Sequence, residues 1–216
     1  MPANRVLIVR HGETDENVLG IVQGQLDTKL NAHGAAQARR TGYALRQENV
    51  TKIICSPLQR AVATGIEIAK HHAAAPHETD ARLKERCFGV LQGQVYRGPA
   101  TKPEETEGIE SSKAMAQRLE HFWRDLVASL AGRDGEVIVL VSHGGAISTL
   151  VNHVIVPQGH ATPAPHVRPS RFWNCSISEL VIPTNDEGGS IVRWSDIAHL
   201  AEANGKHVEN VDEVVA

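Results

Sequence analysis

The first candidate for chemistry is His11, which stands near the start of the chain between Arg10 and Gly12. Four apolar residues, 6–9, precede this group and are typical of a buried strand. A neutral imidazole has a lone pair on one ring nitrogen, and histidine can form covalent intermediates. Arg10 offers a planar fork to two phosphate oxygens, and Gly12 lets the backbone turn sharply. The group is therefore suited to a phosphate site with an imidazole available as nucleophile.

Two further predicted strand ends carry similar residues. The apolar run 137–141 leads through Ser142 to His143 and two glycines, and Ile53-Ile54 ends shortly before Arg60. In parallel α/β sheets, ligands bind outside the carboxyl ends of the strands. Arg60 falls in the first turn of a predicted helix, where the dipole disfavours a cation but favours a bound anion. We therefore expect two arginines and two histidines to surround one phosphate.

Each of these residues could also have a purely structural role, and the residue types alone do not decide between that role and phosphate binding. A lone histidine after a strand is more often structural than catalytic, so His11 has such a reading. His143 could complete a tight strand-to-helix turn, and Arg60 could point into water. The recurrence of Arg and His at several strand ends is what favours the phosphate site.

The apolar patterning alternates strands with helices, which predicts one α/β domain over residues 1–216 with a mostly parallel sheet and an antiparallel pair late in the chain. Asn31 and Ser56 are predicted helix N-caps, the latter followed by Pro57 at the first helical position. Strands are expected at 5–9, 52–55, 77–80, 136–142, 174–182 and 190–194, helices at 32–47, 57–69, 111–130 and 144–154, and loops at 15–30, 97–110 and 156–170.

The last of these loops, 156–170, contains four prolines and is expected to be stiff, neither helix nor strand. Its His160 and His166 do not match a zinc spacing, and they would border the pocket if the loop acted as a lid. The stretch 201–216 alternates charges with valine and is expected to be a frayed or loosely docked tail.

Composition excludes several other classes of protein. The 216 residues carry a net charge of −3, and no basic stripe suggests nucleic acid. Three widely spaced cysteines argue against a disulfide framework and for a reducing compartment. No apolar run approaches a membrane span, and the N-terminus does not fit a signal peptide. We therefore expect a cytoplasmic protein without membrane or nucleic-acid partners, and with no cofactor or metal. Homo-oligomers are possible.

Several motifs, taken in order over about residues 5–200, resemble the histidine phosphatase (phosphoglycerate mutase-like) superfamily. They are Arg10-His11-Gly12-Glu13-Thr14, Asn17, Gln23-Gly24 with Asp27, Ser56-Pro57-Leu58-Gln59-Arg60-Ala61, Leu83-Lys84-Glu85-Arg86-Cys87-Phe88-Gly89, Gly108-Ile109-Glu110-Ser111, Ser142-His143-Gly144-Gly145 and Asn174-Cys175-Ser176. One Arg-His-Gly is weak evidence, whereas all of these at the family's spacing are strong evidence. The resemblance implies a three-layer α/β/α sandwich.

The resemblance also implies roles for these residues. His11 would be the nucleophile and form a phosphohistidine, while Arg10, Arg60 and His143 would complete the phosphate pocket. Glu85 would protonate the leaving oxygen and then activate water, because an alkoxide leaves poorly without a proton. From its residue type alone, Glu85 is more often a surface carboxylate. The remaining implied phosphate- or substrate-binding residues are Asn17, Gln23, Gly24 and Gly144.

The family contains both phosphatases and mutases. In the resemblance, mutases carry a longer insertion after the glutamate segment, whereas here about fifteen mostly polar residues separate Gly93 from Gly108. Gln23 also stands where mutases more often have a small hydroxyl residue. Both points favour a phosphatase acting on phosphomonoesters of small metabolites such as sugar phosphates. A cofactor-dependent phosphoglycerate mutase and a non-catalytic phosphate-binding module are the alternatives.

Overall fold

The apolar runs before the two histidines form the middle of a seven-stranded sheet in the computed structural model, which describes residues 3–96, 108–183 and 188–201. The strand order is β3-β2-β4-β1-β6-β7-β5. The strands are β1 (Asn4–Arg10), β2 (Lys52–Cys55), β3 (His77–Thr79), β4 (Val137–Ser142), β5 (Ala161–Pro163), β6 (Ile177–Ile182) and β7 (Gly189–Asp196).

The strand directions place the candidate residues together at the carboxyl ends of the parallel strands. β3, β2, β4 and β1 are mutually parallel, and Arg10 at the end of β1 pairs with Ser142 at the end of β4. β6 runs antiparallel to both β1 and β7, so the antiparallel part of the sheet lies on one side. β5 joins the far edge through a parallel pairing with β7. This arrangement confirms the predicted mostly parallel α/β sheet.

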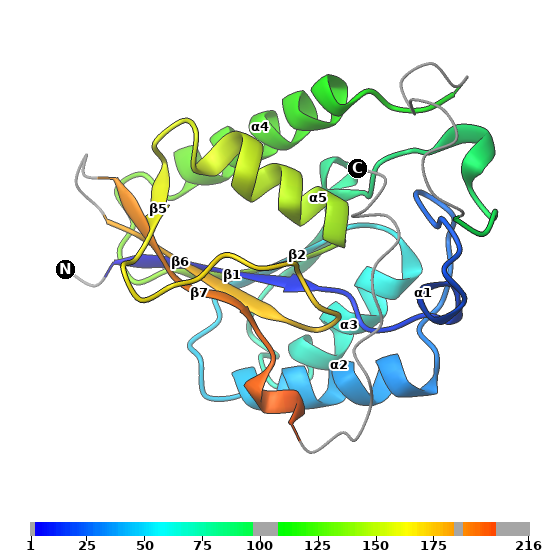
Figure 1. Ribbon diagram of the computed structural model, residues 1–216. Helices are drawn as coiled ribbons and strands as arrows, with labels where there is room; N and C mark the ends of the chain where they lie inside the picture. Colours follow the sequence, from blue (N-terminus) through cyan, green and yellow to red (C-terminus); the bar gives the residue numbers. More distant parts are fainter. Residues whose placement is uncertain (1–2, 97–107, 184–187, 202–216) are drawn as a thin grey trace.

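Helices cover both faces of the sheet, with α4 and α5 on one side and α2 and α3 on the other (Figure 1). The helical elements are α1 (Asp15–Leu19), α2 (Ala32–Leu45), α3 (Gln59–Ala69), η1 (Ala81–Leu83), η2 (Gly89–Leu91), α4 (Ser112–Ser129), α5 (Gly144–Thr149), η4 (Leu150–Ile155, a π-helix) and η5 (Ala198–Leu200). None of the helices in the described ranges is long and apolar enough to cross a membrane.

The sheet has a hydrophobic core on each face, and alternate residues of β1 pack into one or the other. Val6 and Ile8 pack in the larger core with α4 and α5, whereas Leu7 and Val9 pack with residues of α2 and α3. Successive side chains of a strand point to opposite faces, so a strand covered on both faces has to be apolar throughout. This explains why residues 6–9 form an unbroken apolar run directly before the site.

Two of the predicted loops contain regular structure. The loop 15–30 begins with α1, because Thr14 caps the helix through the Asn17 amide and the Asn17 side chain reaches back to Thr14. The loop 156–170 contains β5, which tolerates Pro163 because an edge strand does not need every N–H in the ladder. The prediction that no strand occurs in 156–170 was therefore wrong.

The predicted start of α3 was also wrong. The helix begins at Gln59 rather than Pro57, and its N-cap, Leu58, makes no side-chain cap bond. The Ser56 hydroxyl lies 2.7 Å from His143 Nε2 instead, and Asp27 Oδ1 accepts the Gln59 N–H at 2.7 Å. A carboxylate from the loop before α2 thus caps α3, which local sequence could not reveal.

The other expected elements appear close to their predicted bounds, and Asn31 caps α2 by accepting the Gly34 N–H. Two expectations fall wholly or partly outside the described residues. They concern the loop 97–110 and the tail 201–216, of which 97–107 and 202–216 are not described.

Candidate active site

Three parallel strand ends bring His11, His143 and Ser56 together. His11 follows β1, His143 follows β4 and Ser56 follows β2, and these strands are neighbours in the sheet. The two imidazole rings have centroids 5.1 Å apart and are tilted by 58°. His11 is 2% exposed and His143 is fully buried. The predicted convergence of strand ends therefore holds for both histidines.

The hydrogen bonds of His11 fix which nitrogen can react. Its Nδ1 lies 2.7 Å from the Gly12 carbonyl oxygen, and a carbonyl can only accept, so Nδ1 carries the proton. Nε2 then holds the lone pair, which accepts a bond from Arg60 Nε at 3.3 Å. Burial, then the Arg60 and Arg10 guanidinium groups, lower the pKa of His11 well below its usual value. The imidazole is thus held neutral, with its nucleophilic nitrogen beside a cation.

Arg60 is the second residue of α3 and is fully buried. Its Nη1 donates to the Leu26 carbonyl at 2.7 Å, and its Nη2 donates to the Gly24 carbonyl at 2.8 Å. Gly24 has a φ of +50°, and a Cβ there would lie 2.9 Å from the Arg86 carbonyl oxygen. Gly24, predicted as a substrate-binding residue, therefore has a visible task in holding Arg60.

Arg10 is held from the opposite side by the segment that enters β6. Its Nη1 donates to the Phe172 carbonyl at 2.7 Å, and its own carbonyl accepts the Cys175 N–H at 3.0 Å. Asn174 Nδ2 donates to the His11 carbonyl at 3.0 Å. Cys175 needs a φ of +56°, an uncommon conformation for a residue other than glycine. Asn174 and Cys175 had no individual role in the sequence analysis, only a place in the family pattern.

Asn17 and Gln23 belong to a network of hydrogen bonds within residues 14–28. Asn17 Oδ1 accepts the Thr14 N–H at 3.1 Å and an Asn174 N–H at 3.4 Å. Gln23 Oε1 accepts hydroxyl bonds from Thr28 at 2.6 Å and Thr14 at 3.1 Å. Both side chains are buried, and these bonds orient their amide groups. Their predicted contact with substrate stays a prediction.

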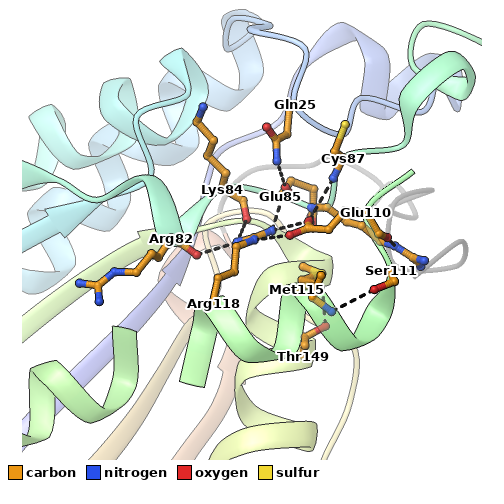
Figure 2. Close-up of polar contacts among 12 residues, drawn as sticks. Gln25, Arg82, Lys84, Glu85, Cys87, Glu110, Ser111, Met115, Arg118 and Thr149 are labelled. Carbon is orange, nitrogen blue, oxygen red and sulfur yellow. Dashed lines mark hydrogen bonds and ion pairs between the residues drawn. The ribbon is translucent and has the colours of Figure 1, made fainter. Parts of the chain in front are cut away.

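Glu85 lies in the irregular segment between η1 and η2 and is fully buried, so the surface reading of this residue is wrong. Its Oε1 accepts the Arg86 N–H and its Oε2 accepts the Gly145 N–H, both at 2.9 Å. A Cβ on Gly145 would lie 2.7 Å from Oε1, so only glycine leaves room there. The carboxyl group is thereby fixed beside the start of α5, which follows His143. Figure 2 shows the polar contacts around this segment.

His143 is the N-cap residue of α5, directly before the buried Gly144. Burial, together with Arg60, His11 and Arg10, lowers its pKa well below the usual value. Within the described part of the chain, its Nδ1 has no hydrogen-bond partner. His143 is therefore neutral without a bound anion. A bound phosphate dianion would favour its protonation by opposing the nearby positive charges.

The two histidines of the loop 156–170 make contacts with residues outside the site. The His160 ring packs edge-on against Trp123, with centroids 6.2 Å apart, next to the pairing of β5 with the first residue of β7. Through β6, the start of β7 lies beside the start of β1, so it is at the opposite end of the strands from Arg10 and His11. His166 Nε2 lies 3.3 Å from the Val192 carbonyl oxygen. These contacts do not support the idea that the two histidines border the pocket.

Comparison with known proteins places this geometry in a family. The family model of the histidine phosphatase superfamily (branch 1) matches residues 6–197. A probable phosphatase of Schizosaccharomyces pombe is 31% identical over 210 residues, covering 94% of this chain and 98% of that protein. The probable phosphoglycerate mutase GpmB of Klebsiella pneumoniae is 33% identical over 212 residues, covering 91% of this chain and 94% of that protein.

A solved structure gives the same result. A mycobacterial glucosyl-3-phosphoglycerate phosphatase in complex with VO3 aligns with a TM-score of 0.72 and 25% identity, over 90% of this chain and 100% of that chain. The likeness confirms the predicted fold, and the relatives named as phosphatases support phosphatase activity. The chain belongs to branch 1 of the histidine phosphatase superfamily.

Proposed function

We propose that this protein hydrolyses phosphomonoesters of small metabolites, such as sugar phosphates, through a phosphohistidine on His11. The observation that carries the proposal is the state of that imidazole. Its Nδ1 is bonded to the Gly12 carbonyl, and its Nε2 lone pair lies beside Arg60. A neutral, oriented imidazole next to a buried cation is what nucleophilic attack on a phosphate dianion requires.

In the first step, His11 Nε2 attacks phosphorus and forms a P–N bond while the bond between phosphorus and the ester oxygen breaks. The electron pair leaves with that oxygen, which takes a proton from Glu85. Arg10, Arg60 and His143 surround the transferring group and offset its charge, the main task of a protein in phosphoryl transfer. The chain supports this scheme through the burial of all these side chains.

In the second step, water attacks the phosphohistidine. Glu85, now a carboxylate, takes the proton of the water, the P–N bond breaks, and the electron pair returns to Nε2. Inorganic phosphate leaves, and both side chains regain their starting states. The Gly145 and Arg86 amides stabilise the charged form of the carboxyl between the steps, because both donate to it.

The test is to trap the intermediate. Incubation with a ³²P-labelled phosphomonoester and an alkaline quench should leave label on His11, located by peptide mapping. His11→Ala should lose the label and nearly all turnover. His153→Ala removes an exposed histidine and should keep both. Label on another residue, or appreciable turnover by His11→Ala, would overturn the proposal.

A panel of sugar phosphates, nucleotides and phosphoglycerates separates the alternatives. Release of inorganic phosphate supports the phosphatase. Transfer between positions of phosphoglycerate, dependent on 2,3-bisphosphoglycerate and faster than phosphate release, would instead indicate a mutase, the activity named for one relative. Binding of these compounds with neither release nor labelling would indicate a phosphate-binding module.

A further inference from the structure

Glu85 lies in a segment that is itself neither a long helix nor a strand. The backbone from residue 82 to residue 85, which includes the end of η1, is nevertheless firmly held, because side chains bond to its four successive carbonyl groups. Ser142 Oγ donates to the Leu83 carbonyl at 2.8 Å, and Gln25 Nε2 donates to the Glu85 carbonyl at 3.0 Å. Arg118 donates to the carbonyls on either side of Leu83 and to that of Glu85. Buried carbonyl groups need such partners, so this segment depends on distant residues for its shape.

Arg118, on α4, makes the largest contribution to this support (Figure 2). Its Nη1 donates to the Arg82 carbonyl at 2.6 Å and the Lys84 carbonyl at 2.8 Å, and its Nη2 donates to the Glu85 carbonyl at 3.1 Å. Its Nε and Nη2 donate to the two carboxylate oxygens of Glu110 at 2.6 and 2.8 Å. All five N–H donors of the guanidinium are therefore engaged, a geometry that lysine cannot reproduce.

Glu110 holds the other side of the same segment. Its backbone N–H donates to the Cys87 carbonyl at 2.8 Å, and its carbonyl accepts Arg86 Nε at 2.7 Å. Its carboxylate also accepts the Cys87 N–H at 3.3 Å. The Glu110 and Arg118 side chains are 16% and 19% exposed, so water competes little with their ion pair. Arg118 thus holds the backbone at residues 82–85, and Glu110 holds it at residues 86 and 87. Glu85 lies between these two groups of contacts.

We propose that the Glu110–Arg118 pair positions Glu85 for proton transfer to and from the substrate. The inference rests on the proposed function, because it assumes that Glu85 is the acid. Arg118 acts through Glu85, which makes it a positioning residue. Proton transfer needs the donor within hydrogen-bond reach of the leaving oxygen, and a misplacement of about 1 Å can cost about 100-fold in rate. Loss of three backbone contacts allows a shift of that size.

The alternative is that Arg118 only attaches α4 to the body of the protein. The two roles differ in how the rate depends on the leaving group. An alkyl phosphate releases a basic alkoxide that needs the proton, whereas p-nitrophenyl phosphate releases a weak base that hardly needs it. A positioning role predicts a large loss for the first substrate and a small loss for the second. A general loss of structure would reduce both equally.

The experiment compares Arg118→Met and Arg118→Lys with Arg124→Met. Arg124 lies on the same helix, has a side chain 69% exposed, and makes a long surface ion pair with Asp125 as its one polar contact among the described residues, so it is the matched control. We expect Arg118→Met to lose about 100-fold in kcat/KM for glycerol phosphate and less than about 5-fold for p-nitrophenyl phosphate. Arg118→Lys should fall between Arg118→Met and wild type, and inhibition by inorganic phosphate should be unchanged.

A second measurement combines Arg118→Met with Glu85→Gln. If Arg118 acts through Glu85, the double variant should be no slower on glycerol phosphate than Glu85→Gln alone. Should Arg118→Met fail to fold, Glu110→Gln replaces it, because this variant keeps an acceptor for Arg118 while it weakens the ion pair. Equal losses on both substrates, or losses that multiply in the double variant, would overturn the inference.

The same data distinguish failure of the inference from failure of the proposed function. If Glu85→Gln shows no difference between the two substrates, Glu85 is not the acid, and the proposed mechanism is wrong at that step. If Glu85→Gln shows the difference and Arg118→Met does not, the mechanism stands and only the positioning role is lost.

Discussion

His11 lies against His143, and Glu85 accepts a hydrogen bond from Gly145, but the chain places His11 and Glu85 in different ways. His11 follows the last residue of β1, a central strand covered on both faces, so the sheet itself fixes its position. Glu85 lies between two short 3₁₀ turns and is fixed by side chains from α4 and from the loop containing Gln25. The phosphate side of the site is thus built on regular structure, and the acid side on long-range hydrogen bonds.

This difference matters because the two sides have different demands. The phosphate side must hold several cations close together, which costs electrostatic free energy and requires a rigid frame. The acid side must present one proton at the leaving oxygen, and its requirement is precision. Variants on the phosphate side should therefore affect every substrate, whereas variants on the acid side should affect mainly substrates with basic leaving groups.

Removal of Arg60 should have the largest effect. Arg60→Ala deletes a cation that lies beside the attacking nitrogen, so we expect kcat/KM to fall about 10⁴-fold on alkyl and aryl phosphates alike. Inhibition by inorganic phosphate should weaken in parallel. Measurement of both substrates and of the inhibition constant tests this prediction. A loss confined to alkyl phosphates would contradict the division between the two sides.

Glu85→Gln should sharpen the comparison from the acid side. We expect a loss of about 10³-fold on glycerol phosphate and less than about 10-fold on p-nitrophenyl phosphate, because only the alkoxide needs a proton. The amide side chain is close in shape to the carboxyl and can still accept a backbone N–H, so the fold should remain intact. Comparable losses on the two substrates would show that Glu85 is not the acid.

The same division decides how much of the site could be predicted from sequence. His11, His143 and Arg60 follow apolar runs, and a buried strand dictates where its last residue points. Their convergence was therefore predictable from the pattern alone. Glu85 carries no such signal, since a glutamate in a polar stretch has the pattern of a surface residue. Only the family resemblance identified it.

Other roles were missed because the partners of these residues are distant in sequence. Ser56 resembles a helix N-cap, yet its hydroxyl lies against His143, and Asp27 caps the helix instead. The Gly24 carbonyl holds Arg60, a role that local sequence does not indicate, and the predicted contact of Gly24 with substrate stays a prediction. Arg118 received no individual role, because a lone arginine on an amphipathic helix resembles any solvated residue. Pairings over tens of residues leave no local pattern.

Gly145→Ala should have a smaller effect, which again falls mainly on substrates with basic leaving groups. The new Cβ would lie 2.7 Å from Glu85 Oε1 and would displace the carboxyl group without removing it. We expect a loss of about 10-fold on glycerol phosphate, little change on p-nitrophenyl phosphate, and about 1–3 kcal/mol less stability from overpacking. Urea unfolding and kinetics on the two substrates measure these effects.

The control for this variant is Glu85→Ala, which removes the atoms that the new Cβ would meet. Adding Gly145→Ala to Glu85→Ala should then cost little further stability, because the crowding is relieved. If Gly145→Ala lowers stability equally in wild type and in Glu85→Ala, crowding against Glu85 is not the cause of the stability loss.

The smallest predicted effect concerns pH and belongs to the phosphate side. The pKa of His143 is lowered well below its usual value by burial and by the nearby cations. Above about pH 6.5 the residue is neutral in both the folded and the unfolded chain, so it has no pH-dependent effect there. Below that pH the unfolded chain binds a proton first, and the folded state loses stability until its own pKa is reached.

Each pH unit in this window costs up to about 1.4 kcal/mol per histidine. His143→Gln should therefore lose less stability than wild type, by about 1 kcal/mol, when the pH falls from 7.5 to 5.5. His153→Gln, which changes an exposed histidine, should behave as wild type does. Urea unfolding at the two pH values measures the difference. An identical acid loss in wild type and His143→Gln would mean that burial and the cations around the phosphate pocket do not keep this imidazole neutral. The phosphate side would then need far less rigidity than its burial among regular strands suggests.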